Sequence, residues 1–275
     1  MSKELLGTEE IQTIEAEMLL KFSKYCCSHD LKFTLIGGTL LGAVRHGGFI
    51  PWDDDIDIGM PRSDYNTLAR SIESFQEETG LLLSGIYTIP IDSTPVIKVL
   101  NPKVAAKESA DTRESFLWID VMPIDSLPSS DTEYSRLILK ANFWRHALGY
   151  LATTSQSSQS KIKRILKRIG SPIRNNKVIY NFLATIVGRK LNSIALVYSE
   201  DTTDYAGVIT WGIYGKGERQ LRCEMEPYDT MLFMNMEMPT MKCWDKYLHD
   251  IYGDYLVLPP EEDRHTHGIK AWLTI

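Results

Sequence analysis

A pair of adjacent glycines followed by a dense cluster of aspartates is the feature that most constrains this chain. Gly37 and Gly38 come directly after an apolar run, and residues 50–58 read Ile-Pro-Trp-Asp-Asp-Asp-Ile-Asp-Ile. Glycine lets backbone N–H groups approach an anion closely, and a helix N-terminus offers free donors and a favourable dipole. Clustered carboxylates hold hard divalent cations, which neutralise phosphate oxygens. The two features together predict a phosphate-binding turn beside a metal site, an arrangement typical of phosphoryl transfer.

The alternation within the aspartate cluster predicts its geometry. Asp55 and Asp57 alternate with Ile56 and Ile58. In a strand, residues i and i+2 point to the same face, so both carboxylates would share one side with the isoleucines buried on the other. Two like charges this close repel each other unless a cation lies between them. The alternative is a solvated acidic turn, because aspartate is common in turns; isoleucine at every second position argues against it.

A calcium-binding loop is a second alternative for the same residues. Asp53, Asp55 and Asp57 match the first three ligand positions of an EF-hand. Position six of that loop requires glycine and position twelve requires glutamate, whereas this chain has Ile58 and Asp64 there. The pattern therefore argues against calcium storage.

The glycines do not match either familiar nucleotide-binding signature. Gly37 and Gly38 with Gly42 do not form G-x-G-x-x-G, and no Gly-Lys-Ser or Gly-Lys-Thr follows them. The sequence therefore excludes both a Rossmann and a P-loop interpretation of this turn.

The run from Gly37 to Met60 resembles the signature of the LicD family, the phosphorylcholine transferases of bacterial surface polysaccharides, which fukutin-type sugar phosphotransferases share. The resemblance continues at 116–125 and returns in short segments between 247 and 267, so that it covers residues 15–125 and 205–270. The family belongs to the nucleotidyltransferase superfamily, whose pattern is a glycine turn, then D-x-D on a strand, then a third carboxylate on a later strand. The resemblance implies that these carboxylates are Asp55, Asp57 and Asp120.

The resemblance also implies roles for these residues. Asp55 and Asp57 are expected to hold Mg²⁺, with Mn²⁺ as an alternative, and Asp120 to be a third metal ligand or the general base. Asp120 lies in an otherwise apolar run, where a carboxylate is costly unless it is paired or bound to metal. The expected phosphate-binding residues are Gly37, Gly38, Thr39, Arg45 and His46.

Several candidates keep two interpretations. Arg45 would hold a diphosphate through its planar guanidinium or else brace an aspartate. His267 matches a family position and is expected either in catalysis or in a structural role. Asp53, Asp54 and Lys98 are expected only to support the site. Trp211, Tyr214 and Trp244 would form a cation–π box for a quaternary ammonium group or else belong to the core.

The charge distribution is strongly asymmetric. The chain carries a net charge of −6, yet the stretch from Tyr134 to Ser199 contains no Asp or Glu and twelve Lys or Arg. That stretch is +12, so the remaining residues carry −18, which is −6 minus 12. Within it, residues 161–169 place isoleucine and leucine on one helical stripe surrounded by basic residues. Such a helix is predicted to lie on an anionic membrane, the alternative being a solvated face.

The periodicity of the chain predicts an α+β fold, a mixed β-sheet flanked by helices, and the resemblance implies that this sheet is nucleotidyltransferase-like. Residues 1–125 and 200–275 are predicted to form the catalytic core, and 126–199 a basic helical insertion. The predicted helices are 9–29, 63–79, 132–151, 161–169, 178–198 and 243–252. The predicted strands include 31–35, 96–100 and 117–121.

Together with these features, the resemblance implies an enzyme that moves phosphorylcholine, or a similar phospho-alcohol, from CDP-choline or a related CDP-alcohol to a sugar hydroxyl. The choice of CDP-choline as the donor follows from the resemblance alone. The expected acceptor is a lipid-linked cell-surface glycan such as teichoic acid or lipopolysaccharide, and no nucleic-acid partner is expected. One alternative is a nucleotidylyltransferase that moves NMP from an NTP to a small alcohol. The other is a non-enzymatic membrane-surface adaptor, which leaves the glycines and the D-x-D unexplained.

The location of the protein is predicted from its termini, hydropathy and cysteines. The first ten residues are polar and acidic, unlike a secretory leader, and no apolar run approaches the ~20 residues of a membrane span. The four cysteines form no C-x-x-C pattern. We therefore expect a cytoplasmic protein with reduced thiols, peripheral at the inner face of the plasma membrane.

Overall fold

A mixed β-sheet forms the centre of the molecule. The computed structural model describes residues 4–86, 88, 94–108, 114–152, 176–226, 228–264 and 266–274. Within them, a ten-stranded sheet has the order β10-β4-β5-β2-β1-β9-β8, with β3 paired to β4, β6 paired to β5 and β7 paired to β6. The strands are β1 (Thr34–Leu35), β2 (Asp57–Pro61), β3 (Leu82–Ser84), β4 (Ile97–Glu108), β5 (Ser115–Leu127), β6 (Tyr205–Val208), β7 (Gln220–Leu221), β8 (Asp229–Phe233), β9 (Met236–Thr240) and β10 (Ile269–Leu273).

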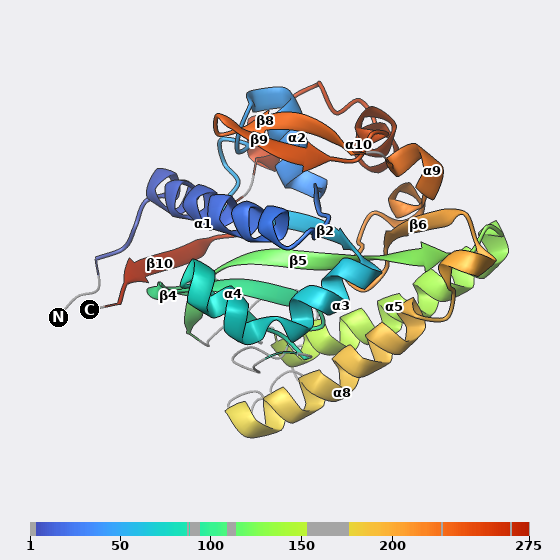
Figure 1. The fold of residues 1–275 in the computed structure, drawn as a ribbon, viewed down its shortest axis with the longest axis horizontal. Helices are drawn as coiled ribbons and strands as arrows, with labels where there is room; N and C mark the ends of the chain where they lie inside the picture. The colour runs from blue at the N-terminus through green and yellow to red at the C-terminus, as the bar shows by residue number, and fades with distance from the viewer. Residues whose placement is uncertain are drawn as a thin grey trace.

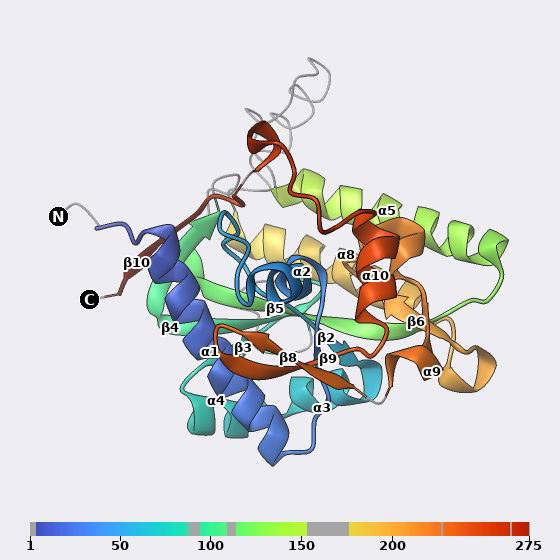
Figure 2. The same ribbon diagram turned by 90° about the horizontal axis from the view of Figure 1, so that it is seen from above.

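Helices cover both faces of this sheet, which confirms the predicted α+β class. The α-helices are α1 (Thr8–Ser28), α2 (Gly37–His46), α3 (Arg62–Arg70), α4 (Ile72–Thr79), α5 (Asp131–Ala152), α8 (Lys177–Ala195), α9 (Arg222–Met225) and α10 (Trp244–Tyr252). Short 3-10 helices are η2 (Glu200–Thr202), η3 (Gly215–Glu218) and η4 (Glu261–Asp263). In Figure 1, α2 and α10 lie above β2 and β5, while α3, α4 and α8 lie below them. Figure 2, seen from above, shows α2 in front of the strands.

Most of the predicted helices are present. The helices predicted at 9–29, 132–151, 178–198 and 243–252 correspond to α1, α5, α8 and α10. The single helix predicted at 63–79 is wrong, because the chain breaks at Ser71 into α3 and α4. The N–H of Ser71 donates to Leu68 O at 3.0 Å, and its hydroxyl donates to Thr67 O at 2.9 Å. A serine side chain that bonds the preceding turn competes with the helical ladder and bends it. The helix predicted at 161–169 lies outside the described residues.

The strands that carry the carboxylates are fixed by their opposite, apolar face. Ile56 and Ile58 are fully buried, as the alternation predicted. Leu117, Ile119 and Val121 of β5 are fully buried on the same side, in the core that also contains aromatic side chains of α1 and α4. Because side chains alternate along a strand, a slip by one residue would expose this apolar set to solvent. The register of β2 and β5 is therefore strongly determined by the core.

A second buried cluster joins α5 and α8 to the end of β5. Its members come from both helices and from the sheet: Leu127, Tyr134, Leu137, Ala141, Leu148, Tyr180, Ala184, Val187, Leu191, Ala195 and Ile209. A polar bridge adds to this apolar contact. Arg62 at the start of α3 donates to both carboxylate oxygens of Asp125, at 2.6 and 2.7 Å, and to Asn192 Oδ1 at 3.0 Å. This polar bridge therefore connects α3, β5 and α8. The predicted domain boundaries at 126 and 199 stay a prediction.

None of the described helices is long and apolar enough to cross a membrane.

We expect Arg62→Met to destabilise the protein strongly. Asp125 is 1% exposed, so removal of its bidentate partner leaves a buried carboxylate unpaired, which costs about 3–5 kcal/mol in comparable pairs. The matched control is Lys32→Met, which breaks an exposed pair with Glu226 at 3.5 Å and should cost less than about 1 kcal/mol. Urea denaturation measures both. Equal losses for the two variants would contradict a stabilising role for the Arg62 bridge.

Candidate active site

Three charged side chains form a row across neighbouring strands. β2 pairs in parallel with β5, which places Asp57 opposite Asp120. β4 pairs antiparallel with β5, which places Lys98 opposite the same Asp120. Residues that are partners across a sheet project from the same face. The sheet therefore presents Asp57, Asp120 and Lys98 side by side on the face that α2 covers.

Asp120 already has two partners in this row. The indole Nε1 of Trp118 donates to its Oδ2 at 3.1 Å, and the Lys98 ammonium lies 3.6 Å from its Oδ1. The same ammonium lies 3.8 Å above the Trp118 ring, a cation–π geometry. The Oδ1 atom is buried and accepts no hydrogen bond. Lys98, expected only to support the site, is thus in direct electrostatic contact with Asp120.

The two glycines place the start of α2 directly against carboxylates. Gly37 has φ = +54°, a left-handed conformation that favours glycine. A Cβ at Gly37 would lie 3.4 Å from Asp57 Oδ2, and one at Gly38 would lie 2.9 Å from Asp53 Oδ2. Any side chain at Gly38 would therefore displace a carboxylate of the site.

The predicted phosphate donors at this turn are used internally in the structure. The N–H of Gly37 donates to the Tyr247 hydroxyl at 3.3 Å. The hydroxyl of Thr39 accepts a hydrogen bond from the N–H of Asp57 at 2.8 Å, and Thr39 is 4% exposed. Thr39 therefore fixes the start of β2, and its assignment to phosphate binding stays a prediction.

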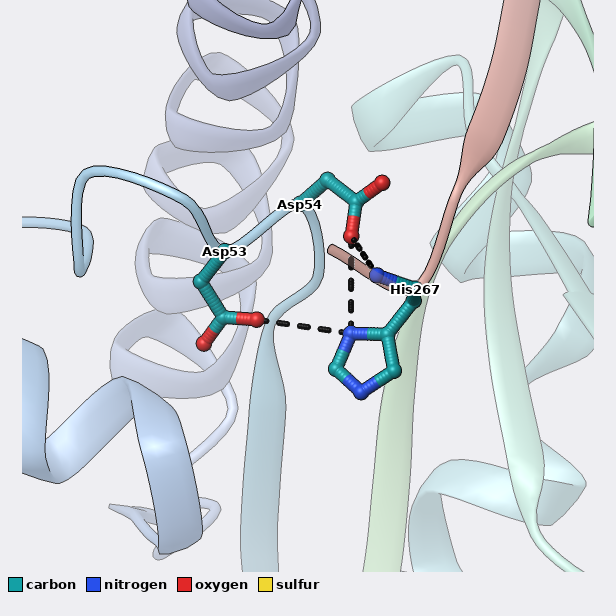
Figure 3. Close-up of side chains that lie close together, drawn as sticks. All are labelled: Asp53, Asp54 and His267. Atoms are coloured by element: carbon teal, nitrogen blue, oxygen red, sulfur yellow. Dashed lines mark hydrogen bonds and ion pairs between the residues drawn. The ribbon is translucent and has the colours of Figure 1, made fainter. Parts of the chain in front are cut away.

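The loop that precedes β2 is fastened to a histidine near the end of the chain. His267 Nδ1 lies 3.3 Å from Asp53 Oδ1, 3.4 Å from Asp54 Oδ1 and 3.2 Å from Asp55 Oδ2. Asp54 also accepts hydrogen bonds from the backbone N–H groups of His267 at 2.8 Å and Ile269 at 2.9 Å. In Figure 3 one imidazole nitrogen of His267 faces the carboxylates of both Asp53 and Asp54.

These contacts set the charge of both partners. Hydrogen bonds to Asp53 and Asp54 raise the pKa of His267 to about 11, against the opposing effect of burial. Burial also opposes ionisation of Asp54, but its hydrogen bonds from His267 and Ile269 outweigh burial and hold its pKa below the usual range. At neutral pH the pair is therefore an imidazolium facing carboxylates.

Asp53 and Asp54 both lie against His267, and the supporting role that the sequence gave them stays a prediction. In the part of the chain that the structure describes, the set of three ligand atoms within 4.8 Å of one another comes from Asp53, Asp54 and His267. The predicted trio of Asp55, Asp57 and Asp120 does not form a set this tight there. An imidazolium has no lone pair for a metal, so the Asp53–Asp54–His267 cluster is an ion-paired group in this structure.

The two aspartates of the D-x-D hold their protons more tightly than usual. Although part of Asp57 is open to solvent, the burial of its carboxyl group, with Asp120 and Asp53 nearby, raises its pKa to about 8. Burial, followed by the charges of Asp57 and Asp53, raises the pKa of Asp55 well above its usual range. Burial and like charges both disfavour the ionised form, so an added cation would release these protons.

Arg45 and His46 pair with each other at the end of α2. Arg45 Nε donates to His46 Nε2 at 2.9 Å, and Arg45 Nη1 donates to Tyr255 O at 3.1 Å. Burial, together with Arg45, lowers the pKa of His46, which agrees with a neutral imidazole that accepts this bond. Both side chains are partly exposed, and their contact with phosphate stays a prediction.

A cluster of tyrosines around a buried glutamate was not predicted. The hydroxyls of Tyr214 and Tyr252 lie 2.8 Å apart, with their rings edge to face at 5.0 Å. Glu218 accepts hydrogen bonds from the Tyr247 hydroxyl and from backbone N–H groups that include that of Tyr214. Tyr247 in turn receives the Gly37 N–H, so this cluster supports the glycine turn from behind. The aromatic partner of Tyr214 is therefore Tyr252. Among the described residues, no ring contact joins Tyr214 to Trp211 or Trp244, with which it was predicted to form a cation–π box.

A fully buried glutamate on α1 was also missed. Glu15 has no hydrogen-bond partner on either oxygen. Burial, and then the charges of Asp55 and Asp54, raise its pKa well above the usual range. Its position was visible in the sequence, because Glu15 follows Ile11 by four residues and precedes Leu19 by four, on the apolar stripe of the helix.

Glu218 should make the stability of the fold depend on pH. Burial raises its pKa from the ordinary 4.5 of a glutamate to about 7 in the folded protein. The folded state therefore binds this proton more tightly than the unfolded chain, and stability should fall as pH rises through the window between these values. The loss should be on the order of 3 kcal/mol at 1.36 kcal/mol per pKa unit.

The measurement compares urea denaturation of wild type and Glu218→Gln at pH 5 and pH 8. The variant lacks this ionisation, so its free energy of unfolding should change less between the two pH values. Glu237→Gln, at an exposed position of β9, is the control and should follow wild type. A Glu218→Gln variant with the full wild-type pH dependence would show that the ionisation of Glu218 does not contribute.

Comparison with known proteins places this site in a family. Residues 30–126 match the model described as LicD/FKTN/FKRP, nucleotidyltransferase domain. The chain is 28% identical over 273 residues to Lipopolysaccharide cholinephosphotransferase LicD of Haemophilus influenzae, covering 96% of this chain and 97% of that protein. A stretch of 34 residues is 53% identical to Ribitol 5-phosphate transferase FKRP of mouse and human, covering 12% of this chain and 7% of that protein. The predicted resemblance is confirmed, because residues 30–126 match the nucleotidyltransferase domain described for LicD, FKTN and FKRP.

Proposed function

We propose that this chain is a phosphotransferase that moves phosphorylcholine, or a similar phospho-alcohol, from a CDP-linked donor to a sugar hydroxyl of a cell-surface glycan. Similarity to a lipopolysaccharide cholinephosphotransferase along 96% of the chain supports the reaction class. The shorter match to a ribitol 5-phosphate transferase supports a phospho-alcohol as the transferred group. The observation that carries the proposal is the in-register pairing of Asp57 with Asp120 beneath the glycine turn.

The residues of the site fit a hard divalent cation, which we propose to be Mg²⁺ with Mn²⁺ as the alternative. The donors are carboxylate oxygens, the ligands that Mg²⁺ prefers. Asp120 Oδ1 is buried without a hydrogen bond, and the pKa of Asp57 is raised to about 8 by burial and neighbouring carboxylates. Asp55 and Asp57 are the residues that would hold the cation, with Asp120 as either the third ligand or the base. When bound, the cation would neutralise charge on the donor diphosphate and on the departing CMP.

Asp120 is proposed as the group that accepts the proton of the attacking sugar hydroxyl. The Trp118 indole N–H donates to one oxygen of its carboxylate and the Lys98 ammonium lies 3.6 Å from the other, so both groups hold the carboxylate in position. Asp53 and Asp54 are held by His267, so their proposed task is to keep the loop before β2 in place. Catalysis would then rest on positioning and electrostatics, which dominate phosphoryl transfer.

A nucleotidylyltransferase is the second candidate, favoured by the description of the matched domain. Products distinguish the two reactions, because phospho-alcohol transfer releases CMP and nucleotidylyl transfer releases pyrophosphate. Incubation with CDP-choline, CDP-ribitol, CDP-glycerol or NTPs, each with Mg²⁺ and a glycan acceptor, followed by chromatography of the nucleotides, tests the proposal. Pyrophosphate release from an NTP, without CMP release from any CDP-alcohol, would overturn it.

We expect Asp57→Asn to abolish turnover and to leave the fold intact. The substitution removes a carboxyl group whose ionisation is disfavoured by burial and by neighbouring carboxylates, so the metal-free variant should melt at a temperature equal to or above that of wild type. Asp229→Asn, at an exposed position of β8, should change neither activity nor melting temperature. If Asp57→Asn kept its activity under saturating Mg²⁺, the assignment of Asp57 as a cation ligand would be wrong.

Asp120→Asn should lower kcat about 10²-fold or more, the usual contribution of a positioned base. Donor binding in the presence of Mg²⁺ should change much less, because the asparagine keeps the shape of the side chain. Single-turnover kinetics and calorimetric titration with donor separate the two effects. A large loss of donor affinity with nearly unchanged kcat would make Asp120 a metal ligand instead.

A further inference from the structure

The outer face of α5 exposes large apolar side chains. Leu139 and Phe143 are 68% and 67% exposed. They lie two residues to either side of Ala141, which is buried in the second core cluster. At 100° per residue they project about 200° away from it, on the side of the helix opposite its packed face.

The outer face of α8 repeats this arrangement. Phe182 and Ile186 are 65% and 40% exposed and lie two residues to either side of the buried Ala184. Val178, one turn earlier than Phe182, is 79% exposed. The two helices run side by side in opposite directions below the sheet (Figure 1). These exposed side chains form one outward-facing apolar stripe on each helix. We name the two stripes together the α5–α8 face and define it by Leu139, Phe143, Val178, Phe182 and Ile186.

Positive charge surrounds this apolar face. Arg136 and Lys140 on α5, and Arg189 and Lys190 on α8, are exposed. The sequence from Tyr134 to Ser199 contains no Asp or Glu that could neutralise them. An apolar surface rimmed by cations of one sign is the composition of helices that lie in a membrane interface.

The charge also decides between a membrane and a second copy of the chain. Two copies joined through this face would bring like charges together across an apolar contact, which is destabilising. An anionic surface would instead complement the cations while the apolar side chains leave water. We infer that the α5–α8 face docks onto a bilayer that contains anionic lipid.

Docking would use both kinds of side chain. Phe143 and Phe182 would enter the boundary between headgroups and acyl chains, and the basic residues would contact anionic headgroups. Each basic residue near such a surface strengthens binding about fivefold. The inference goes beyond the proposed function and does not depend on it, because the vesicle measurement involves neither donor nor acceptor.

Cosedimentation of the full-length protein with vesicles tests the inference. Wild type should sediment with vesicles of phosphatidylcholine and phosphatidylglycerol at a 70:30 ratio, and much less with phosphatidylcholine alone. The double variants Phe143→Ser with Phe182→Ser, and Lys140→Glu with Lys190→Glu, should each weaken binding to the anionic vesicles more than tenfold. Transfer to a soluble acceptor, where it occurs, should be unchanged in both.

Two control variants sit on other surfaces. Leu232→Ser on β8 removes an apolar side chain that is 56% exposed, and Lys103→Glu reverses an exposed charge on β4. Both should bind anionic vesicles as wild type does. Thermal melts of all variants establish that the altered proteins are folded under the conditions of the measurement.

Three results would overturn the inference. The first is wild-type protein that stays in the supernatant with anionic vesicles at low salt. The second is folded double variants that bind as tightly as wild type, which would place the lipid contact elsewhere in the chain. The third is a wild-type dimer in sedimentation velocity that Phe143→Ser with Phe182→Ser converts to monomer, which would make the face a contact between copies.

Discussion

Repulsion among carboxylates gathered at one end of β2 is the constraint on which the rest of the site depends. Five aspartates meet there (Asp53, Asp54, Asp55, Asp57 and Asp120), and the charge of Glu15 is coupled to four of them. In the described part of the chain, cationic contacts to this group come from His267 and Lys98. Two cations do not balance so many carboxylates, so some of these groups retain protons. The folded chain is therefore arranged to receive further positive charge.

The counter-charges come from segments remote in sequence. His267 and Ile269 bind Asp54 across 213 and 215 positions of the chain. β10, which begins at Ile269, pairs with β4, and β4 carries Lys98 to its position beside Asp120. Formation of the acidic loop therefore requires the C-terminal strand to be in place. Such non-local pairing makes the site one of the later features to form during folding, because the loop-closure entropy must be offset before these contacts form.

The local chemistry of the site could be predicted from the sequence, because it follows from short-range patterns. The alternation of residue types predicted that Ile56 and Ile58 lie in the core and that the D-x-D lies at the start of a strand. The resemblance identified Asp120, which the strand register places opposite Asp57. Contacts between distant segments could not be predicted in this way. No periodicity links Asp53 to His267, or Tyr214 to Tyr252. These contacts depend on how β10 joins the sheet and how α10 packs against it.

The structure also differs from the sequence prediction where a single side chain or a single contact overrides the local preference of the chain. The helical periodicity of 63–79 is real, but a single serine hydroxyl redirects the backbone at Ser71. The turn between β8 and β9 uses Met234 and Asn235 at φ of 50° and 60°, without the glycine that usually marks such turns. The N–H of Met234 donates to Gly47 O at 2.8 Å, so contact with the end of α2 supports a conformation that its own residue type disfavours.

Two features of the isolated chain cost stability, and a binding partner would offset each of them. Buried carboxylates such as Glu15 and Asp55 oppose folding, because each must be desolvated and held near like charge. Exposed phenylalanines on α5 and α8 leave apolar surface in water. A cation would relieve the first cost and a lipid surface the second, and any partner that binds the folded state alone also stabilises it. Since the buried carboxylates and the exposed phenylalanines lie on different elements, the cost of each can be offset separately. Apparent stability should therefore respond to divalent cation and to lipid as independent additions, with the site ready for its donor whether or not the chain is on a membrane.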